Sequence, residues 1–176
     1  VAAVDFLVAE GKADPARVAI RGGSAGGFTT LAALAFTDRF RAGANYFGVS
    51  DIAALAATSH KFESQYDVSL IGPPDEAVYR ARSPIFHLDG FTEPLITFQG
   101  AEDRIVTPDQ SRKIVAALDQ RGVMHAYIEF DGEQHNPERD QVRDARLREL
   151  GIEVMRIPNR HFFMLDDTPF EDVFRA

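Results

Sequence analysis

The chain contains no cysteine, which excludes disulfide bonds and thiolate metal sites. No apolar run approaches the roughly 20 residues that a membrane-spanning helix needs, and no basic stretch leads into an apolar one at the N-terminus. Positive charge is scarce, since 19 Lys and Arg residues stand against 27 Asp and Glu residues, for a formal net charge of −8. The resulting field repels phosphate, so we expect no binding to nucleic acid or to membranes. Together these absences favour a cytoplasmic location.

The sequence has 176 residues, of which 45% are hydrophobic and 26% are charged. That length and balance are typical of a globular chain with one sizeable core. The first residues, from Val1 to Gly11, have the spacing of a helix that is already under way. We therefore expect that an upstream portion precedes Val1.

Segments typical of strands and of helices alternate along the chain. Short apolar runs predict strands, and apolar residues spaced three and four apart predict helices. Alternation of this kind favours an α/β fold with βαβ units, a mostly parallel sheet flanked by helices, and right-handed crossovers. The predicted strands are 17–21, 42–47, 95–99 and 125–130, and the predicted helices are 1–11, 25–36 and 109–121.

A glycine-rich turn, GGSAG at 22–26, separates the first predicted strand from the next helix. It matches the G-x-S-x-G pattern, in which a sharp turn raises a serine above the sheet. We predict that Ser24 is a nucleophile and that the backbone N–H of Ala25 faces the oxyanion of the reaction. Glycine is expected at 22 and 26 because side chains there would collide with the neighbouring strand and helix. The alternative is a turn that binds an anion or has no ligand.

An activated serine needs a base within reach and an acid that orients the base. In α/β-hydrolases the chain order is Ser, then Asp or Glu, then His, each on a loop after a strand. Asp103 follows one predicted strand and His135 follows the last, so both lie at the edge where sites in such sheets occur. We predict a triad of Ser24, Asp103 and His135, and we prefer Asp103 to its neighbour Glu102.

Each residue of the predicted triad, taken alone, also has a structural interpretation. Alone, Asp103 is a loop or capping aspartate and His135 is a solvated loop histidine, but order, loop type and turn together favour the triad. The other histidines lack this placement: His60, His87, His125 and His161. His125 begins a strand and His87 lies in a turn, so we interpret these two as structural.

Four separated segments agree, in order, with a known family. They are RGGSAGG at 21–27, ARSPI at 81–85, FQGAEDRIV at 98–106 and FDGEQH at 130–135. On these segments the chain resembles the prolyl oligopeptidase family, most closely its acylaminoacyl-peptidase-like branch. The resemblance covers residues 1–135 and implies the C-terminal part of an α/β-hydrolase domain. It implies a serine peptidase that cleaves short peptides or acylated amino acids, and we expect no cofactor and no metal ion.

Two departures from the family pattern bear on activity. The family's β-propeller and the first strands of its hydrolase domain do not occur in this sequence. The loop that gives the second oxyanion donor in the family belongs to that part and does not occur here either. Losing one such donor typically costs ~100–1,000-fold in rate. In addition, Asn136 and Pro137 follow the histidine where the family has Gly-Phe. Two outcomes stay open, an active hydrolase and an inactive remnant, and we expect association with the missing N-terminal portion or a homo-oligomer.

The sequence changes character after His135, which predicts a boundary there and a tail over 136–176 of different origin. Asn136 is a good N-cap, and Gly151 suits the end of the helix that follows. A strand is expected at 153–157. Together with the last strand of the sheet, this helix and strand would form a C-terminal βαβ extension.

The tail carries a second resemblance. IEFDGEQH at 128–135, with Arg139-Asp140 and VMRI at 154–157, resembles the C-terminal part of very-short-patch-repair-type endonuclease domains. That resemblance implies an alternative function, a metal-dependent endonuclease. Glu129 and Asp131 lie on one strand face and could hold Mg²⁺, with His135 as acid or base. A non-catalytic α/β domain is the third hypothesis.

Overall fold

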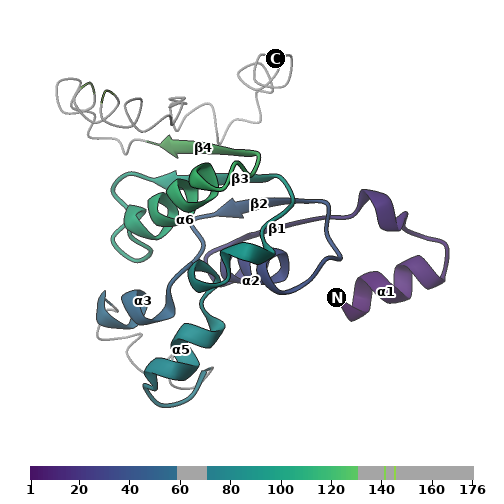
Figure 1. Ribbon diagram of the computed structural model, residues 1–176, viewed down its shortest axis with the longest axis horizontal. Coiled ribbons are helices and arrows are strands. Elements are labelled where there is room, and N and C mark those ends of the chain that lie inside the picture. Colours follow the sequence, from purple (N-terminus) through teal and green to yellow (C-terminus); the bar gives the residue numbers. More distant parts are fainter. Residues whose placement is uncertain (59–70, 131–140, 142–144, 146–176) are drawn as a thin grey trace.

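The computed structural model describes residues 1–58 and 71–130, together with Gln141 and Ala145. Within this part of the chain the strands form one fully parallel sheet in the order β1-β2-β3-β4 (Figure 1). The predicted α/β fold class with a mostly parallel sheet is therefore confirmed. The strands are β1 (Ala19–Gly23), β2 (Ala42–Tyr46), β3 (Leu95–Gly100) and β4 (His125–Phe130).

Helices connect the strands. They are α1 (Ala2–Ala9) before β1, α2 (Ala25–Phe36) between β1 and β2, α3 (Ile52–Thr58) and α5 (Glu76–Arg82) between β2 and β3, and α6 (Pro108–Gln120) between β3 and β4. Three short 3₁₀ helices lie at Pro15–Arg17, Pro84–Phe86 and Leu88–Gly90. Each strand lies beside the strand that precedes it in the chain, so right-handed crossovers place α2 and α6 on the same face of the sheet.

Two elements, α2 and β4, have the predicted bounds. The chain turns after α1 at Gly11, which has a φ of +66°. The start of β1 differs from the prediction. β1, by contrast, begins at Ala19 rather than at residue 17. The Asp14 side chain accepts the N–H of Ala16 at 2.9 Å and holds a 3₁₀ helix there, which delays the strand. At its other end the strand continues to Gly23 because it still pairs with β2.

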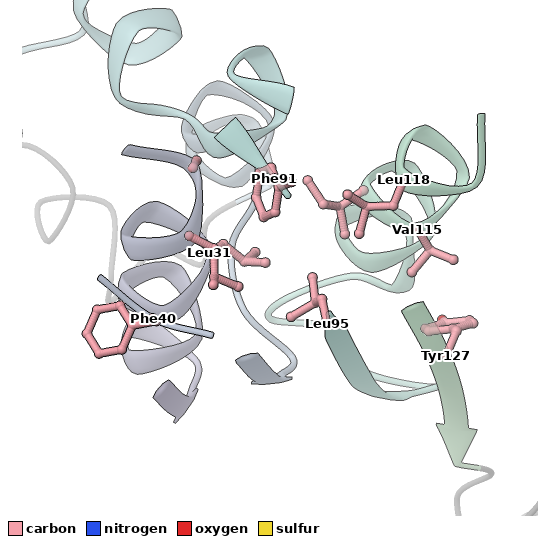
Figure 2. Close-up of a cluster of buried hydrophobic side chains, with 10 residues drawn as sticks. Leu31, Phe40, Phe91, Leu95, Val115, Leu118 and Tyr127 are labelled. Carbon is pink, nitrogen blue, oxygen red and sulfur yellow. The ribbon is translucent and has the colours of Figure 1, made fainter. Parts of the chain in front are cut away.

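The main core lies between the sheet and the two helices that share its face (Figure 2). Leu31 of α2 and Leu118 of α6 are fully buried, and they belong to the same cluster as Leu95 of β3 and Tyr127 of β4. Fully burying a side chain of this size contributes about 1.5–3 kcal/mol. The packing fixes both helices against the strands, and therefore fixes the turns where the strands end.

Aromatic rings cross the opposite face of the sheet near the carboxyl ends of its strands. Tyr46 and Phe98 stack with ring centroids 4.6 Å apart and planes 6° apart. Phe98 and Phe130 follow at 6.2 Å and 14°. The three rings come from β2, β3 and β4, so they hold neighbouring strands in register at the edge where their loops begin.

Most of the predicted tail lies outside the described residues. Within the helix expected at 137–150 the structure describes Gln141 and Ala145, which are helical and exposed. The boundary at 135 and the strand at 153–157 stay predictions. Among the described residues, no helix combines the length and the apolar character that crossing a membrane requires.

Candidate active site

Ser24 occupies the turn between β1 and α2 with φ 54° and ψ −117°. A non-glycine residue rarely has a positive φ, and such strain is concentrated at functional sites. Backbone hydrogen bonds hold the turn on both sides. The Ser24 N–H donates to the carbonyl of Tyr46 at 3.0 Å, and the Ser24 carbonyl accepts the N–H of Phe28 at 3.0 Å. The serine itself is exposed. The structure therefore presents it above the carboxyl edge of the sheet, as the sequence predicts for a nucleophile.

The two glycines of the motif differ in why they are small. A Cβ on Gly22 would lie 2.3 Å from the carbonyl oxygen of Gly26, so the predicted collision at position 22 is confirmed. A Cβ on Gly26 would meet no described atom within 4 Å, so the predicted collision at position 26 is wrong. Helix α2 and strand β1 approach each other closely at Gly22, where the backbone of the helix passes over the strand, and the side of Gly26 faces open space. One helical position later, a Cβ on Gly27 would lie 2.5 Å from the Cα of Gly48, which brings α2 against the turn after β2.

Asp103 lies in the loop after β3 and is partly buried. Its Oδ1 accepts the N–H groups of Ile105 at 2.9 Å and Val106 at 3.0 Å. Among the described residues no hydrogen bond to Oδ2 is found, so that oxygen is available to orient an imidazole. The competing acid, Glu102, is exposed. This geometry supports the preference for Asp103.

His135 lies outside the described residues, and so do His60 and His161. The start of the loop that leads to His135 is nevertheless fixed, because the carbonyl of Phe130 accepts the N–H of Ala101 at 2.7 Å. The loops after β3 and β4 therefore begin side by side. The structure brings Ser24 and Asp103 to one edge of the sheet, and the position of the base stays a prediction.

The two described histidines lie elsewhere. The His125 ring Nδ1 lies 2.8 Å from the carbonyl oxygen of Val123, at the beginning of β4 and hence at the edge opposite Ser24. His87 lies between two 3₁₀ helices, and its ring meets that of Phe36 edge-on at 4.7 Å. Both positions agree with a structural role.

Glu129 is 1% exposed, and the side chains of Arg112 and Tyr127 bind its carboxylate. Arg112 Nη2 donates to Oε1 at 3.0 Å and the Tyr127 O–H donates to Oε2 at 2.7 Å. Burial first, and the neighbouring Glu129 charge second, raise the pKa of Tyr127 well above its usual range. A metal ion at Glu129 would have to displace the guanidinium of Arg112. No cluster of three or more His, Cys, Asp or Glu side chains in the described part of the chain could hold a metal ion. The geometry gives no support to the endonuclease alternative, whose other residues, Asp131 and His135, are not described.

Phe47 is a site feature that sequence reasoning missed. It has a φ of +41°, which is uncommon for a bulky residue, and its side chain is 36% exposed. Its N–H donates to the carbonyl of Phe98 at 2.7 Å, and its ring lies 3.2 Å from where a Cβ on Gly23 would be. The ring therefore lies next to the residue that precedes Ser24. Nothing in the local pattern predicted this, because a positive φ at phenylalanine has no sequence signal.

Known proteins with similar sequences and folds are peptidases. A family profile described as the prolyl oligopeptidase family matches residues 1–150. A puromycin-hydrolyzing peptidase of Mycobacterium tuberculosis is 44% identical, and the match covers 89% of this chain and 26% of that one, with a TM-score of 0.73. An acylaminoacyl peptidase of Pyrococcus horikoshii is 30% identical over 73% of this chain and 21% of its own, with a TM-score of 0.66. Dipeptidyl peptidase family member 6 of Caenorhabditis elegans is 32% identical over 79% of this chain and 20% of its own length.

Two points follow from the extent of these matches. The chain spans 20–22% of the length of the curated relatives it matches. The family profile also continues past His135 to residue 150. The endonuclease-like resemblance of the tail is not supported by these matches, and the predicted boundary at 135 stays a prediction.

Proposed function

The chain belongs to the prolyl oligopeptidase family, and we propose that it carries the catalytic triad of a serine peptidase, formed by Ser24, Asp103 and His135. The observation that carries the proposal is the conformation of Ser24. An exposed serine with a φ of 54°, at the start of a helix and at the carboxyl edge of a parallel sheet, is a nucleophile elbow.

The proposal gives each of these residues a role. Ser24 attacks the scissile carbonyl carbon while His135 accepts its proton, and the C–N bond breaks as the histidine returns that proton to the leaving amine. Asp103 keeps Oδ1 on two backbone N–H groups and offers Oδ2 to the imidazole. Ala25 is the first residue of α2, so its N–H is unpaired within the helix and can donate to the oxyanion. Water then hydrolyses the acyl-enzyme by the same steps in reverse order.

The names of the relatives suggest the substrate class. They include a puromycin-hydrolyzing peptidase and acylaminoacyl peptidases. The first name describes a peptidase that hydrolyses puromycin, and the second describes peptidases named for acylaminoacyl groups. We therefore propose short peptides or acyl-amino acids as substrates, cleaved near their amino-terminal end.

Hydrolysis of aminoacyl and acylaminoacyl anilides by the chain and by Ser24→Ala tests this proposal. We expect the variant to lose about 10⁴-fold or more in kcat, because the nucleophile is removed. Thr37→Ala is a matched control, since it removes a hydroxyl from the far end of the same helix. Wild-type rates for Ser24→Ala, or equal losses in both variants, would contradict the proposal.

A further inference from the structure

Three consecutive residues at the start of α6 bind the loop after β2 and the carboxyl-terminal parts of β3 and β4. Gln110 Oε1 accepts the backbone N–H of Ser50, in the loop after β2, at 2.9 Å. Ser111 donates its hydroxyl to the Oε1 of Gln99, in β3, at 2.7 Å. Arg112 pairs with Glu129, in β4. The first turn of this helix therefore links the strand ends from which the loops of the proposed site emerge.

The Ser111 contact continues to Asp103 through a short series of hydrogen bonds. Gln99 Nε2 donates to the carbonyl oxygen of Val106 at 3.0 Å and to that of Gly100 at 3.2 Å. The N–H of the same Val106 donates to Asp103 Oδ1. The Gln99 amide thus connects Gly100, the last residue of β3, with Val106, one of the two residues whose N–H groups hold the Asp103 carboxylate.

Burial shields this series of hydrogen bonds from water. Gln99 and Ser111 are 0% exposed, and Val106 is 3% exposed. A carboxamide has one acceptor and two donor hydrogens, and two carbonyls face its nitrogen here. Turning the amide over would place its oxygen against those carbonyls and leave buried groups unpaired, which is costly. Ser111, on the other side, is satisfied by the amide oxygen in the observed orientation.

We propose that Gln99, oriented by Ser111, is the positioning residue for Asp103. The inference rests on the proposed function, in which Asp103 is the catalytic acid. Without the Gln99 amide, the Val106 carbonyl loses its donor and the loop no longer holds the carboxylate in one place. The imidazole that Asp103 orients is then misaligned, so we expect the loss to fall on the catalytic step.

The test compares Gln99→Met and Gln99→Glu with Ser83→Ala. Methionine keeps the volume without the donors, and glutamate keeps the acceptor for Ser111 but loses the donors to Val106. Ser83 is a matched control, because it is also 0% exposed and its Oγ donates to Tyr79 and accepts from Ile52. We expect both Gln99 variants to lose about 10- to 100-fold in kcat with KM nearly unchanged, while Ser83→Ala retains the wild-type kcat. The proposal would be overturned if kcat fell no further in the Gln99 variants than in Ser83→Ala, or if only KM changed.

Amide hydrogen exchange at Val106 gives a readout that does not depend on activity. We expect faster exchange of this amide in Gln99→Met than in wild type or Ser83→Ala, because its acceptor on Asp103 is no longer fixed. If the wild-type chain hydrolyses no substrate, the proposed function fails, and this exchange rate still decides whether Gln99 holds Asp103. Unchanged exchange in Gln99→Met contradicts the positioning role even in an active enzyme.

Discussion

Ser24 has a backbone conformation that a serine adopts only when its surroundings require it. The Tyr46 carbonyl and the Phe28 N–H hold the residue on either side. The Gly22 backbone allows the start of α2 to cross β1 at van der Waals contact. At the scale of single residues, therefore, the strain at the nucleophile is maintained by the small size of a neighbour.

Position 22 tests this explanation. Gly22→Ala would place a Cβ 2.3 Å from the backbone of Gly26, which cannot move without shifting α2. We expect a loss of about 1–3 kcal/mol or more in the free energy of unfolding, together with a loss of activity. Gly26→Ala is the matched control, because its Cβ meets no described atom and alanine favours a helix by about 0.5–1 kcal/mol. Urea denaturation measures both. Equal stability of the two variants would show that the approach of helix and strand is not as close as described.

At the scale of elements, α6 has both an apolar and a polar role. Its Ile114, Val115 and Leu118 enter the core, whereas its first turn carries the buried Gln110 and Ser111 and the partly buried Arg112. Glu129, at the end of β4, is the most buried charged group that this turn contacts. A carboxylate in that environment needs its cation, because removing one partner of a buried pair leaves the other charge uncompensated.

Removing the guanidinium of Arg112 should therefore lower the free energy of unfolding. Arg112→Met keeps much of the side-chain volume but removes the ion pair between Arg112 and Glu129, and we expect a loss of about 2–3 kcal/mol in the free energy of unfolding, since Arg112 itself is partly exposed. Arg41→Met breaks the more exposed pair with Glu93 and should cost less than about 1 kcal/mol. The double variant Arg112→Met, Glu129→Leu should recover only part of the loss, because it removes the buried charge but also the acceptor of the buried Tyr127 hydroxyl. Chemical denaturation of the wild type and the variants measures these losses. Equal losses of unfolding free energy in Arg112→Met and Arg41→Met would refute this account of α6.

The same cluster predicts a dependence on alkaline pH. Burial and the Glu129 charge raise the pKa of Tyr127, so the folded chain keeps a proton that an unfolded tyrosine releases near pH 10. The stability that this proton confers is present below about pH 10 and is lost as the pH rises toward the folded-state pKa. Above about pH 10, the unfolding free energy of wild type should fall more steeply than that of Tyr127→Phe, by up to about 1.4 kcal/mol per pH unit. Urea titrations across this range measure the slopes, and parallel slopes would argue against a buried, neutral phenol.

Local pattern predicted the four strands and the helices α1, α2 and α6, but it did not predict α3 or α5, between β2 and β3. Local pattern located α2, α6 and β4 to within one residue at each end. The hydrogen bonds of the α6 turn were not predictable, since Ser50 and Gln110 lie 60 residues apart and share no periodicity. The sequence does contain a sign that such contacts exist. Gln99 and Glu129 are polar residues within apolar strand runs, and such residues need buried partners.

At the scale of the whole molecule, the sheet order explains why a site can form at all. Parallel strands in sequential order place every loop after a strand at one edge, so Ser24 and Asp103 reach the same edge although 79 positions separate them (103 − 24). The sequence motifs predicted this arrangement and the family. They did not reveal the strained Phe47, the free space at Gly26 or the Gln99 contacts, because these depend on packing rather than on residue order.

Reaction with a fluorophosphonate probe tests the central claim most directly, because the probe modifies a serine only when a base activates it within an assembled site. We predict that the folded chain gains the mass of one phosphonyl group, that the modified peptide contains Ser24, and that Ser24→Ala is not labelled. Denatured chain should not react, which separates site chemistry from general reactivity. A folded chain that stays unlabelled, or that is labelled at another serine, would contradict the account.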